Sequence, residues 1–124
     1  MSTVFITDAE APLGVLLANH FSAIGFRVKT HPANGDVESI RTAIGSTNDI
    51  EILINNAEPP VDRLAFEDID EETISSMIDC VARTAFFAVQ AVQPIMGCNG
   101  GGKIINISSS APIRGMLGGA HYSV

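Results

Sequence analysis

Four short runs with strand-like composition, each of a length suited to one strand of a sheet, recur along the chain and are separated by segments with helical periodicity. The runs cover residues 3–7, 26–31, 50–55 and 103–108. Strands that alternate with helices are typical of a parallel sheet whose two faces are both covered. The pattern therefore predicts an α/β fold with a doubly wound parallel sheet.

The segments between these runs carry the signals of helix starts and stops. Helices are expected at residues 13–24, 37–44 and about 71–93. Pro12 suits a first helical turn, and Gly25 and Gly45 suit helix ends. Either Asp68 or Asp70 can cap the long third helix. Its apolar side chains fall on one broad face with 3.6-residue spacing: Ile74, Met77, Ile78, Val81, Ala85, Phe86, Val89 and Val92.

The length and composition restrict what the protein can be. With 124 residues it is one domain at most, large enough to bury a core. A formal charge of −7, with only seven Lys and Arg, disfavours nucleic acid and anionic membranes as partners. The longest apolar stretch, 85–96, is too short to span a bilayer. No signal peptide is visible, and Cys80 and Cys98 are expected as thiols, so we expect a cytoplasmic protein.

A serine and a tyrosine follow the fourth run at a separation of thirteen residues. Ser109 stands at the expected strand end, and Tyr122 lies two residues before Val124, the last residue of the sequence. A hydroxyl and a phenol that face one another can move a proton when a nearby cation favours the phenolate. That cation commonly follows the tyrosine by one helical turn, at position 126. A serine after a strand also suits turn formation and helix capping.

Three segments, in this order, resemble motifs of the short-chain dehydrogenase/reductase family. Thr7–Gly14 lies where the family carries its glycine-rich loop, and Asn55–Ala57 matches the start of its Asn-Asn-Ala-Gly. Asn106–Ser109 with Tyr122 matches its catalytic serine and tyrosine at the right spacing. The resemblance covers nearly the whole chain and implies a Rossmann-like, dinucleotide-binding domain.

The resemblance also implies an activity and a set of site residues. A nicotinamide cofactor, NAD or NADP, would lie across the carboxyl ends of the strands. Tyr122 would be the general acid/base, and Ser109 would position the substrate oxygen. The implied cofactor-binding residues are Thr7, Leu13, Gly14, Asp36, Asn55 and Ala57; no metal is implied. The implied protein interconverts a carbonyl and an alcohol in a small molecule. It is expected to form a dimer or tetramer through the helix at 71–93, although the apolar face of that helix suits plain core packing equally well.

The chain departs from the family pattern where the cofactor phosphates would lie. Asp8 and Pro12 stand in place of two glycines, and Glu58 replaces the glycine of Asn-Asn-Ala-Gly. Proline has no N–H to offer a phosphate. A carboxylate such as that of Asp8, at ~4 Å from a phosphate, would repel it by ~4 kcal/mol at an effective dielectric of about 20. Ala82 stands where an asparagine completes the family's proton relay. These residues put cofactor binding in question.

The segment around the second strand leaves the choice of cofactor open. Thr30-His31-Pro32 ends that strand without the carboxylate that would bind an NAD ribose. Arg27 and Lys29 lean towards NADP, but they suit ordinary solvated positions as well. The stretch from the second to the third strand is short, and we expect it to lack one helix and one strand of the family pattern.

Two alternative functions and the extent of the domain remain as hypotheses. The halohydrin dehalogenases are relatives that keep the serine and tyrosine but use no cofactor. Thr7 to Gly14 keeps the spacing of their first loop, with Pro12 in the place of an aromatic residue. A lysine at position 126 would favour the dehydrogenase and an arginine the dehalogenase. The other alternative is a catalytically silent relative.

Residues 1–124 are expected to form a single incomplete domain, truncated after the fourth or fifth strand and inactive on its own.

Overall fold

The computed structural model describes residues 1–59 and 62–123. Its centre is a parallel sheet of four strands, β1 (Thr3–Thr7), β2 (Arg27–His31), β3 (Ile50–Asn55) and β4 (Lys103–Asn106). The strands lie in the order β2-β1-β3-β4. The predicted Rossmann-like parallel α/β fold is thereby confirmed.

The two strands that follow β1 in the chain, β2 and β3, lie on opposite sides of it. From β1 the chain runs through α1 (Pro12–Ala23) to β2 on one side, and then through α2 (Val37–Gly45) to β3 on the other side. Reversal of the strand order opens a crevice at the carboxyl ends of the two strands concerned, here β1 and β3. Because α2 is the only helix between β2 and β3, β2 is the edge strand on that side of the described sheet.

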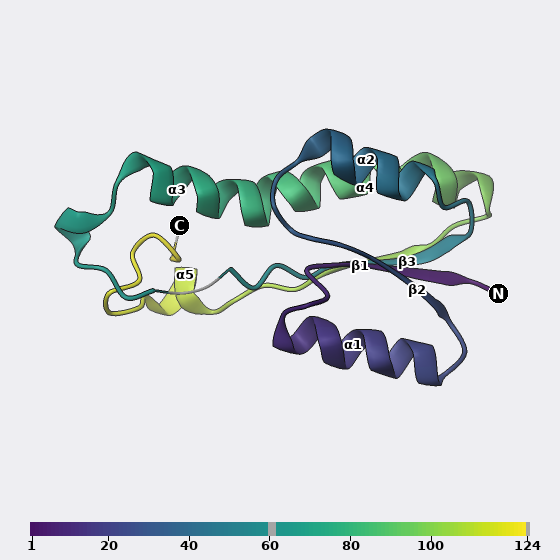
Figure 1. The fold of residues 1–124 in the computed structure, drawn as a ribbon, viewed down its shortest axis with the longest axis horizontal. Coiled ribbons are helices and arrows are strands. Elements are labelled where there is room, and N and C mark those ends of the chain that lie inside the picture. The colour runs from purple at the N-terminus through teal and green to yellow at the C-terminus, as the bar shows by residue number, and fades with distance from the viewer. Residues whose placement is uncertain (60–61, 124) are drawn as a thin grey trace.

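Helices cover both faces of the sheet (Figure 1). The helix α1 lies on one face, whereas α2 and α4 (Thr84–Cys98) lie on the other. Successive side chains of a strand point to opposite faces, so β1 contributes to two separate cores. Val4 and Ile6 pack in the cluster that includes Leu17 and Phe21 of α1. The intervening Phe5 packs on the opposite face with residues of α2, β3 and α4: Ile40, Ile44, Leu53, Val92 and Met96.

The long helix predicted at 71–93 consists of three successive segments, after the short 3₁₀ helix η1 (Phe66–Asp68). Asp70 is the N-cap of the segment α3 (Glu71–Ile78), and its carboxylate accepts the backbone N–H of Thr73 at 2.8 Å. A π-helical segment, η2 (Asp79–Arg83), leads into α4. The hydroxyl of Thr84 donates to the Asp79 carbonyl at 3.1 Å and accepts the N–H of Gly35 at 2.9 Å. The hydrogen bond to Gly35, in the loop before α2, thus occurs where the π-helical segment η2 widens the helix.

The helix also ends later than predicted. The expected end at residue 93 was wrong, because α4 continues through Pro94 to Cys98. Proline removes one helical hydrogen bond. Ile95 and Met96, beyond the proline, pack into the core under α4, and this burial offsets the loss.

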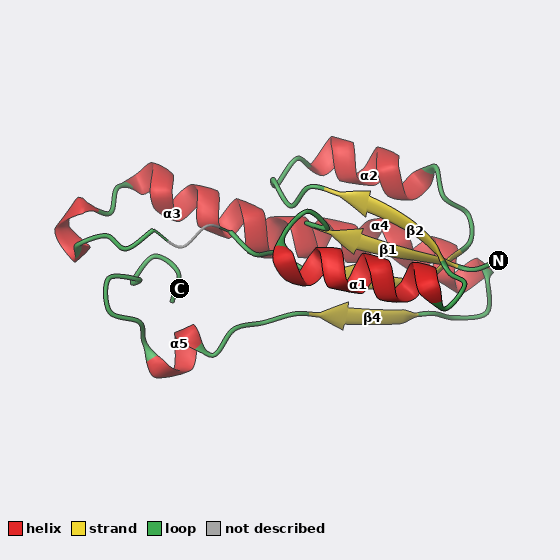
Figure 2. Cartoon of the chain, turned by 60° about the horizontal axis from the view of Figure 1, so that its bottom comes forward, coloured by secondary structure: helices red, strands yellow, loops and turns green. Residues whose placement is uncertain are grey.

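The strand β4 forms the other edge of the described sheet (Figure 2). It is shorter than the predicted run at 103–108, although the N–H of Ile107 still donates to the Asn55 carbonyl at 2.9 Å. Ile104 and Ile105 are 41% and 39% exposed. A short helix that the sequence did not predict, α5 (Ala111–Arg114), follows β4 on the way to Tyr122.

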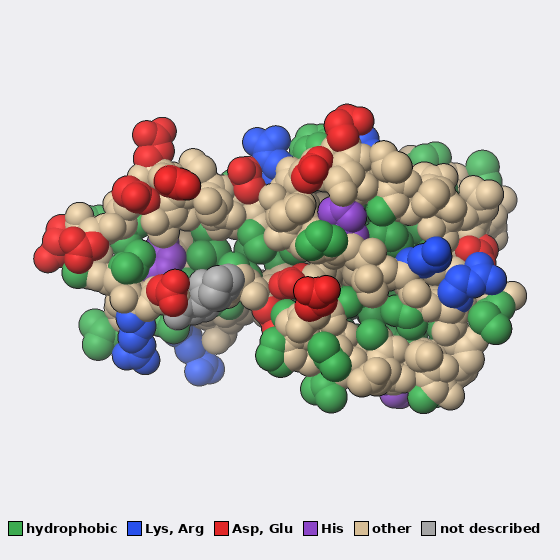
Figure 3. All heavy atoms as spheres, in the orientation of Figure 1, with side chains coloured by type: hydrophobic (Ala, Val, Ile, Leu, Met, Phe, Trp, Pro, Cys, Tyr) green, Lys and Arg blue, Asp and Glu red, His purple; other side chains and the backbone are tan. Residues whose placement is uncertain are grey.

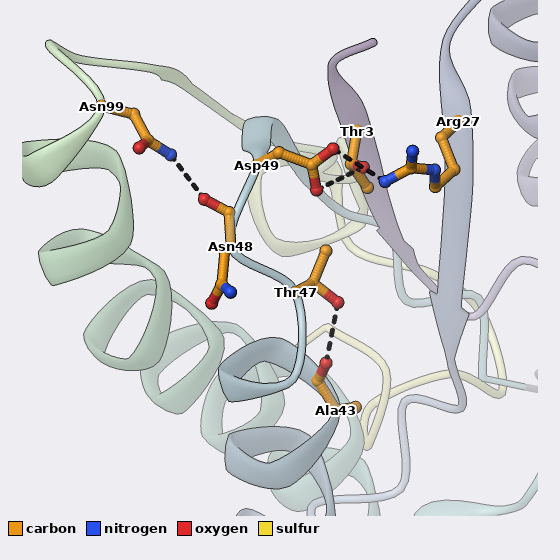
Figure 4. Close-up of polar contacts among 7 residues, drawn as sticks. All are labelled: Thr3, Arg27, Ala43, Thr47, Asn48, Asp49 and Asn99. Atoms are coloured by element: carbon orange, nitrogen blue, oxygen red, sulfur yellow. Dashed lines mark hydrogen bonds and ion pairs between the residues drawn. The ribbon is translucent and has the colours of Figure 1, made fainter.

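Polar contacts join three strands at the amino end of the sheet, opposite the crevice (Figure 4). The Asp49 carboxylate accepts the Thr3 hydroxyl at 2.9 Å and the Arg27 guanidinium at 2.8 Å. These two groups, the hydroxyl first, hold the pKa of Asp49 below its ordinary value. The carboxylate therefore ties the starts of β1 and β2 to the start of β3.

Candidate functional site

A cavity of about 600 Å³ lies beyond the carboxyl end of the sheet and gathers residues from four segments of the chain. Leu13 comes from the start of α1, Ala57 and Glu58 follow β3, and Ser109 and Tyr122 follow β4. Met77, Ile78, Val81 and Ala82 of the long helix form one wall. Four of the predicted site residues, namely Leu13, Ala57, Ser109 and Tyr122, therefore line one cavity.

The two predicted catalytic residues are held in this cavity by local hydrogen bonds. The hydroxyl of Ser109 accepts the backbone N–H of Ala111 at 3.1 Å, at the start of α5. The backbone N–H of Tyr122 donates to the Gly119 carbonyl at 3.0 Å, and its side chain is half-buried. Ser109 can both shape the turn and present its hydroxyl to a ligand, because a hydroxyl can donate while it accepts. The site thus combines a hydroxyl and a phenol that suit proton transfer at a substrate oxygen.

A second cavity, of about 550 Å³, lies over the crevice between β1 and β3. Thr7, Asn55 and Ala57 line it, together with side chains of η2, α4 and the end of β4. The amide nitrogen of Asn55 donates to the Asn106 side-chain oxygen at 2.8 Å. The buried amide oxygen of Asn55 has no hydrogen-bond partner among the described residues. This edge of the crevice can therefore receive a hydrogen-bond donor from a ligand.

Hydrogen bonds of Thr7 connect the carboxyl ends of β1 and β3. Its buried hydroxyl accepts the Asn56 N–H at 3.0 Å and donates to the Asn56 carbonyl at 3.1 Å. Asn56 in turn donates its side-chain N–H to the Asp8 carbonyl at 3.2 Å. Thr7 thus has a structural role that the sequence analysis missed, because its partner lies 49 positions away.

Replacement of Thr7 by valine should destabilise the protein. Valine has nearly the same shape but leaves the buried N–H and carbonyl of Asn56 without this partner, at a cost of about 1–3 kcal/mol. Thr7→Ser retains the hydroxyl and serves as the matched control. Urea unfolding of both variants measures the difference, and equal midpoints would show that the hydroxyl does not stabilise the fold.

Asp36, another predicted cofactor residue, is the N-cap of α2. Its carboxylate accepts the backbone N–H of Ser39 at 3.0 Å. At the end of β2, the ring Nε2 of His31 lies 2.7 Å from the Ser39 hydroxyl. Asp36 lines neither of the two cavities described above. Its contact with a cofactor therefore stays a prediction.

The loop between β1 and α1 makes a tight turn that lies close to the first turn of α1. Asp8 adopts a left-handed conformation with φ of 50°, in a position where the family pattern has glycine. A Cβ atom on Gly14 would lie 2.4 Å from the Asp8 carbonyl oxygen, so only glycine fits where α1 approaches this loop. The predicted importance of Gly14 thus has a steric reason.

The charges around this loop do not suit a dinucleotide phosphate. The Asp8 carboxylate accepts the backbone N–H of Glu58 at 2.8 Å, and it is therefore directed at the loop after β3. The carboxylate of Glu58 lies 3.5 Å from the backbone nitrogen of Leu13, in the first turn of α1. Pro12 offers no N–H. Because a carboxylate lies against the first N–H of α1, the group that would otherwise receive an anion, the residues in this arrangement do not fit a pyrophosphate.

The two cysteines differ in their surroundings, and their reactivity should differ accordingly. Burial, and then the Asp8 carboxylate, raise the pKa of the Cys80 thiol above its ordinary value, whereas Cys98 is exposed at the end of α4. Because the thiolate is the reactive form, iodoacetamide at mildly alkaline pH should label Cys98 first. Peptide mass spectrometry over time measures both rates; faster labelling of Cys80 would contradict the expected order.

Within residues 1–59 and 62–123, no three His, Cys, Asp or Glu side chains are grouped so that they could hold a metal ion. In the same part of the chain, no helix has the length and apolar character that crossing a membrane requires.

Comparison with known proteins agrees with this arrangement. The family model described as short chain dehydrogenase matches residues 3–124. The 3-oxoacyl-(acyl-carrier-protein) reductase of Synechocystis sp. is 31% identical over 117 residues, which cover 94% of this chain and 47% of that protein. The chain thus spans about half the length of this curated relative.

Solved structures show the same fold. A short-chain dehydrogenase from Streptomyces avermitilis has a TM-score of 0.85 at 20% identity, over 98% of this chain and 54% of that one. A protein described as a dehalogenation enzyme has a TM-score of 0.81 at 22% identity, over 98% of this chain and 59% of that one. At such identities these likenesses concern the fold alone, but the family model covers nearly every residue. The chain belongs to the short-chain dehydrogenase family.

Proposed function

We propose that the protein is an oxidoreductase that interconverts a carbonyl and an alcohol in a small molecule. The observation that supports this most directly is the joint presence of Ser109 and Tyr122 in one cavity at the carboxyl end of the sheet. In the direction of reduction, the Tyr122 hydroxyl donates a proton to the substrate oxygen, and Ser109 donates a hydrogen bond to that oxygen. NADH or NADPH would be the hydride carrier of such a reaction.

The substrate class that we propose is a 3-oxoacyl thioester. The relative from Synechocystis sp. described above is a 3-oxoacyl-(acyl-carrier-protein) reductase, and it matches 94% of this chain. The cavity wall formed by Met77, Ile78 and Val81 is apolar and suits the acyl portion of such a substrate.

The test is an assay of the protein expressed from its complete gene. Acetoacetyl-CoA is supplied with NADH or with NADPH, and the loss of reduced nicotinamide is followed by absorbance. We expect oxidation of one of the two nucleotides that depends on the thioester. A folded protein that oxidises neither, with this thioester or with simple ketones and aldoses, would overturn the proposal.

A second candidate is a cofactor-independent reaction on a vicinal haloalcohol. The observation that favours it is the Glu58 carboxylate at the first turn of α1, in the place of a cofactor phosphate. In this reaction Tyr122 takes the proton of the alcohol, the resulting alkoxide displaces halide from the neighbouring carbon, and an epoxide forms. Halide release without any nucleotide would support this candidate; a protein silent in both assays would be a non-catalytic relative.

A further inference from the structure

We propose that Glu58 is an internal anion that occupies the phosphate position of the site, so that a dinucleotide binds only when this carboxylate moves away. The inference rests on the proposed function, because it concerns the cofactor of that reaction. It assigns to Glu58 an autoinhibitory contact with the start of α1.

The backbone of Glu58 is fixed by the turn at Asp8. The N–H of Asp8 donates to the His31 carbonyl at 2.8 Å, and the Asp8 carbonyl accepts the N–H of Ala11 at 3.2 Å. The Asn56 side chain donates to the same carbonyl at 3.2 Å. With its backbone held by these bonds, Asp8 accepts the Glu58 N–H on its carboxylate at 2.8 Å. The loop after β3 is thus positioned against the loop before α1.

This positioning brings the Glu58 side chain to the amino end of α1. The first helical residue, Pro12, has no N–H, so Leu13 carries the first N–H of the helix. The Glu58 carboxylate lies 3.5 Å from that nitrogen. A helix amino terminus attracts negative charge, which explains why an acid is stable there. At 3.5 Å the hydrogen bond is long and weak, so a competing phosphate can displace it.

Nothing positive in the cavity offsets the carboxylate. Among the described residues, neither of the two cavities at the sheet end has a lysine or arginine in its lining. Acidic side chains lie over the start of α1 and gather near the start of α3 (Figure 3). A phosphate that enters beside an undisplaced Glu58 therefore meets like charge with no neutralising partner.

The test is titration of NADPH and NADH into the wild type and four variants, followed by nucleotide fluorescence. Glu58→Gln and Glu58→Ala remove the charge and should tighten binding by ~10- to 100-fold, since like-charge repulsion at a partly solvated site is worth a few kcal/mol at most. Glu67→Gln, an exposed acid outside both cavities, should match the wild type. Thermal unfolding confirms that each variant is folded, and Glu58→Gln keeps nearly the shape of the original side chain.

Asp8→Asn provides the sharper control. Asparagine tolerates the left-handed conformation and still accepts the Glu58 N–H, so this variant removes the charge at position 8 alone. Because the Asp8 carboxylate is directed at the loop after β3 and not at the first N–H of α1, this variant should tighten nucleotide binding less than Glu58→Gln does. If Asp8→Asn tightens binding as much as Glu58→Gln, or if neither Glu58 variant gains affinity, the proposal is wrong.

These outcomes separate the inference from the proposed function. A wild type that binds nucleotide as tightly as the Glu58 variants overturns the role of Glu58 and leaves the oxidoreductase in place. Tight binding by the Glu58 variants without carbonyl reduction supports the role of Glu58 and removes the oxidoreductase. If no variant binds either nucleotide, both proposals fall.

Discussion

Replacement of Tyr122 by phenylalanine should lower the rate of carbonyl reduction by about 100- to 10,000-fold, the usual contribution of a positioned general acid. Phenylalanine keeps the ring that lines the cavity and removes only the hydroxyl that donates the proton. The loss should therefore fall on kcat, whereas KM and nucleotide affinity change little. Steady-state kinetics with acetoacetyl-CoA on the protein from the complete gene measures both parameters.

The serines after β4 supply the companion variants. Ser109→Ala should also lower kcat, since Ser109 lines the same cavity. Ser110→Ala is the matched control, because Ser110 is the N-cap of α5 without any side-chain capping bond. Retention of the wild-type kcat by Tyr122→Phe would mean that the phenol is not the proton donor. Equal losses of kcat in Ser109→Ala and Ser110→Ala would show that the turn before α5, and not the Ser109 hydroxyl, affects the rate.

Replacement of Phe5 by alanine should cost about 3–5 kcal/mol of unfolding free energy, as expected for loss of a fully buried aromatic side chain. Phe5 is 1% exposed and lies between the sheet and the two helices α2 and α4. Because domains are stable by only about 5–15 kcal/mol, this one change should remove a large part of the stability. Urea unfolding followed by circular dichroism measures it.

Phe66→Ala is the control for this substitution. Phe66 is 81% exposed in η1, so the same change of side chain there should alter stability by less than about 0.5 kcal/mol. A similar cost at both positions would mean that Phe5 does not belong to the core that holds α2 and α4 on the sheet.

The sequence predicted those parts of the fold that depend on local pattern. β1 and β3 have the predicted bounds, since each is an apolar run ended by polar residues. Gly25 ends α1 with φ of 97°, as its position suggested. The π-helical segment at Asp79–Arg83 was not predictable, because it accompanies a bond between Thr84 and Gly35, 49 positions apart. The four-residue helix α5 is too short for any periodicity to be seen.

In the candidate site, too, the sequence predicted some features and not others. Motif order was enough to select Ser109, Tyr122, Leu13 and Ala57 as candidate site residues, and the structure places all four around one cavity. The substitutions at Asp8 and Glu58 were visible, but their arrangement was not. The sequence showed the charge of Asp8 but not its direction, because its carboxylate accepts the Glu58 N–H from a loop 50 positions away. Which of two acids faces a helix end depends on such distant bonds and not on local sequence.

The half-buried position of Tyr122 in the cavity has a practical consequence. The chain has one tyrosine and no tryptophan, so its ultraviolet emission comes almost entirely from this one ring. A molecule that enters the cavity changes the surroundings of that ring directly. Within residues 1–124, the candidate catalytic position is therefore its own optical reporter of ligand binding.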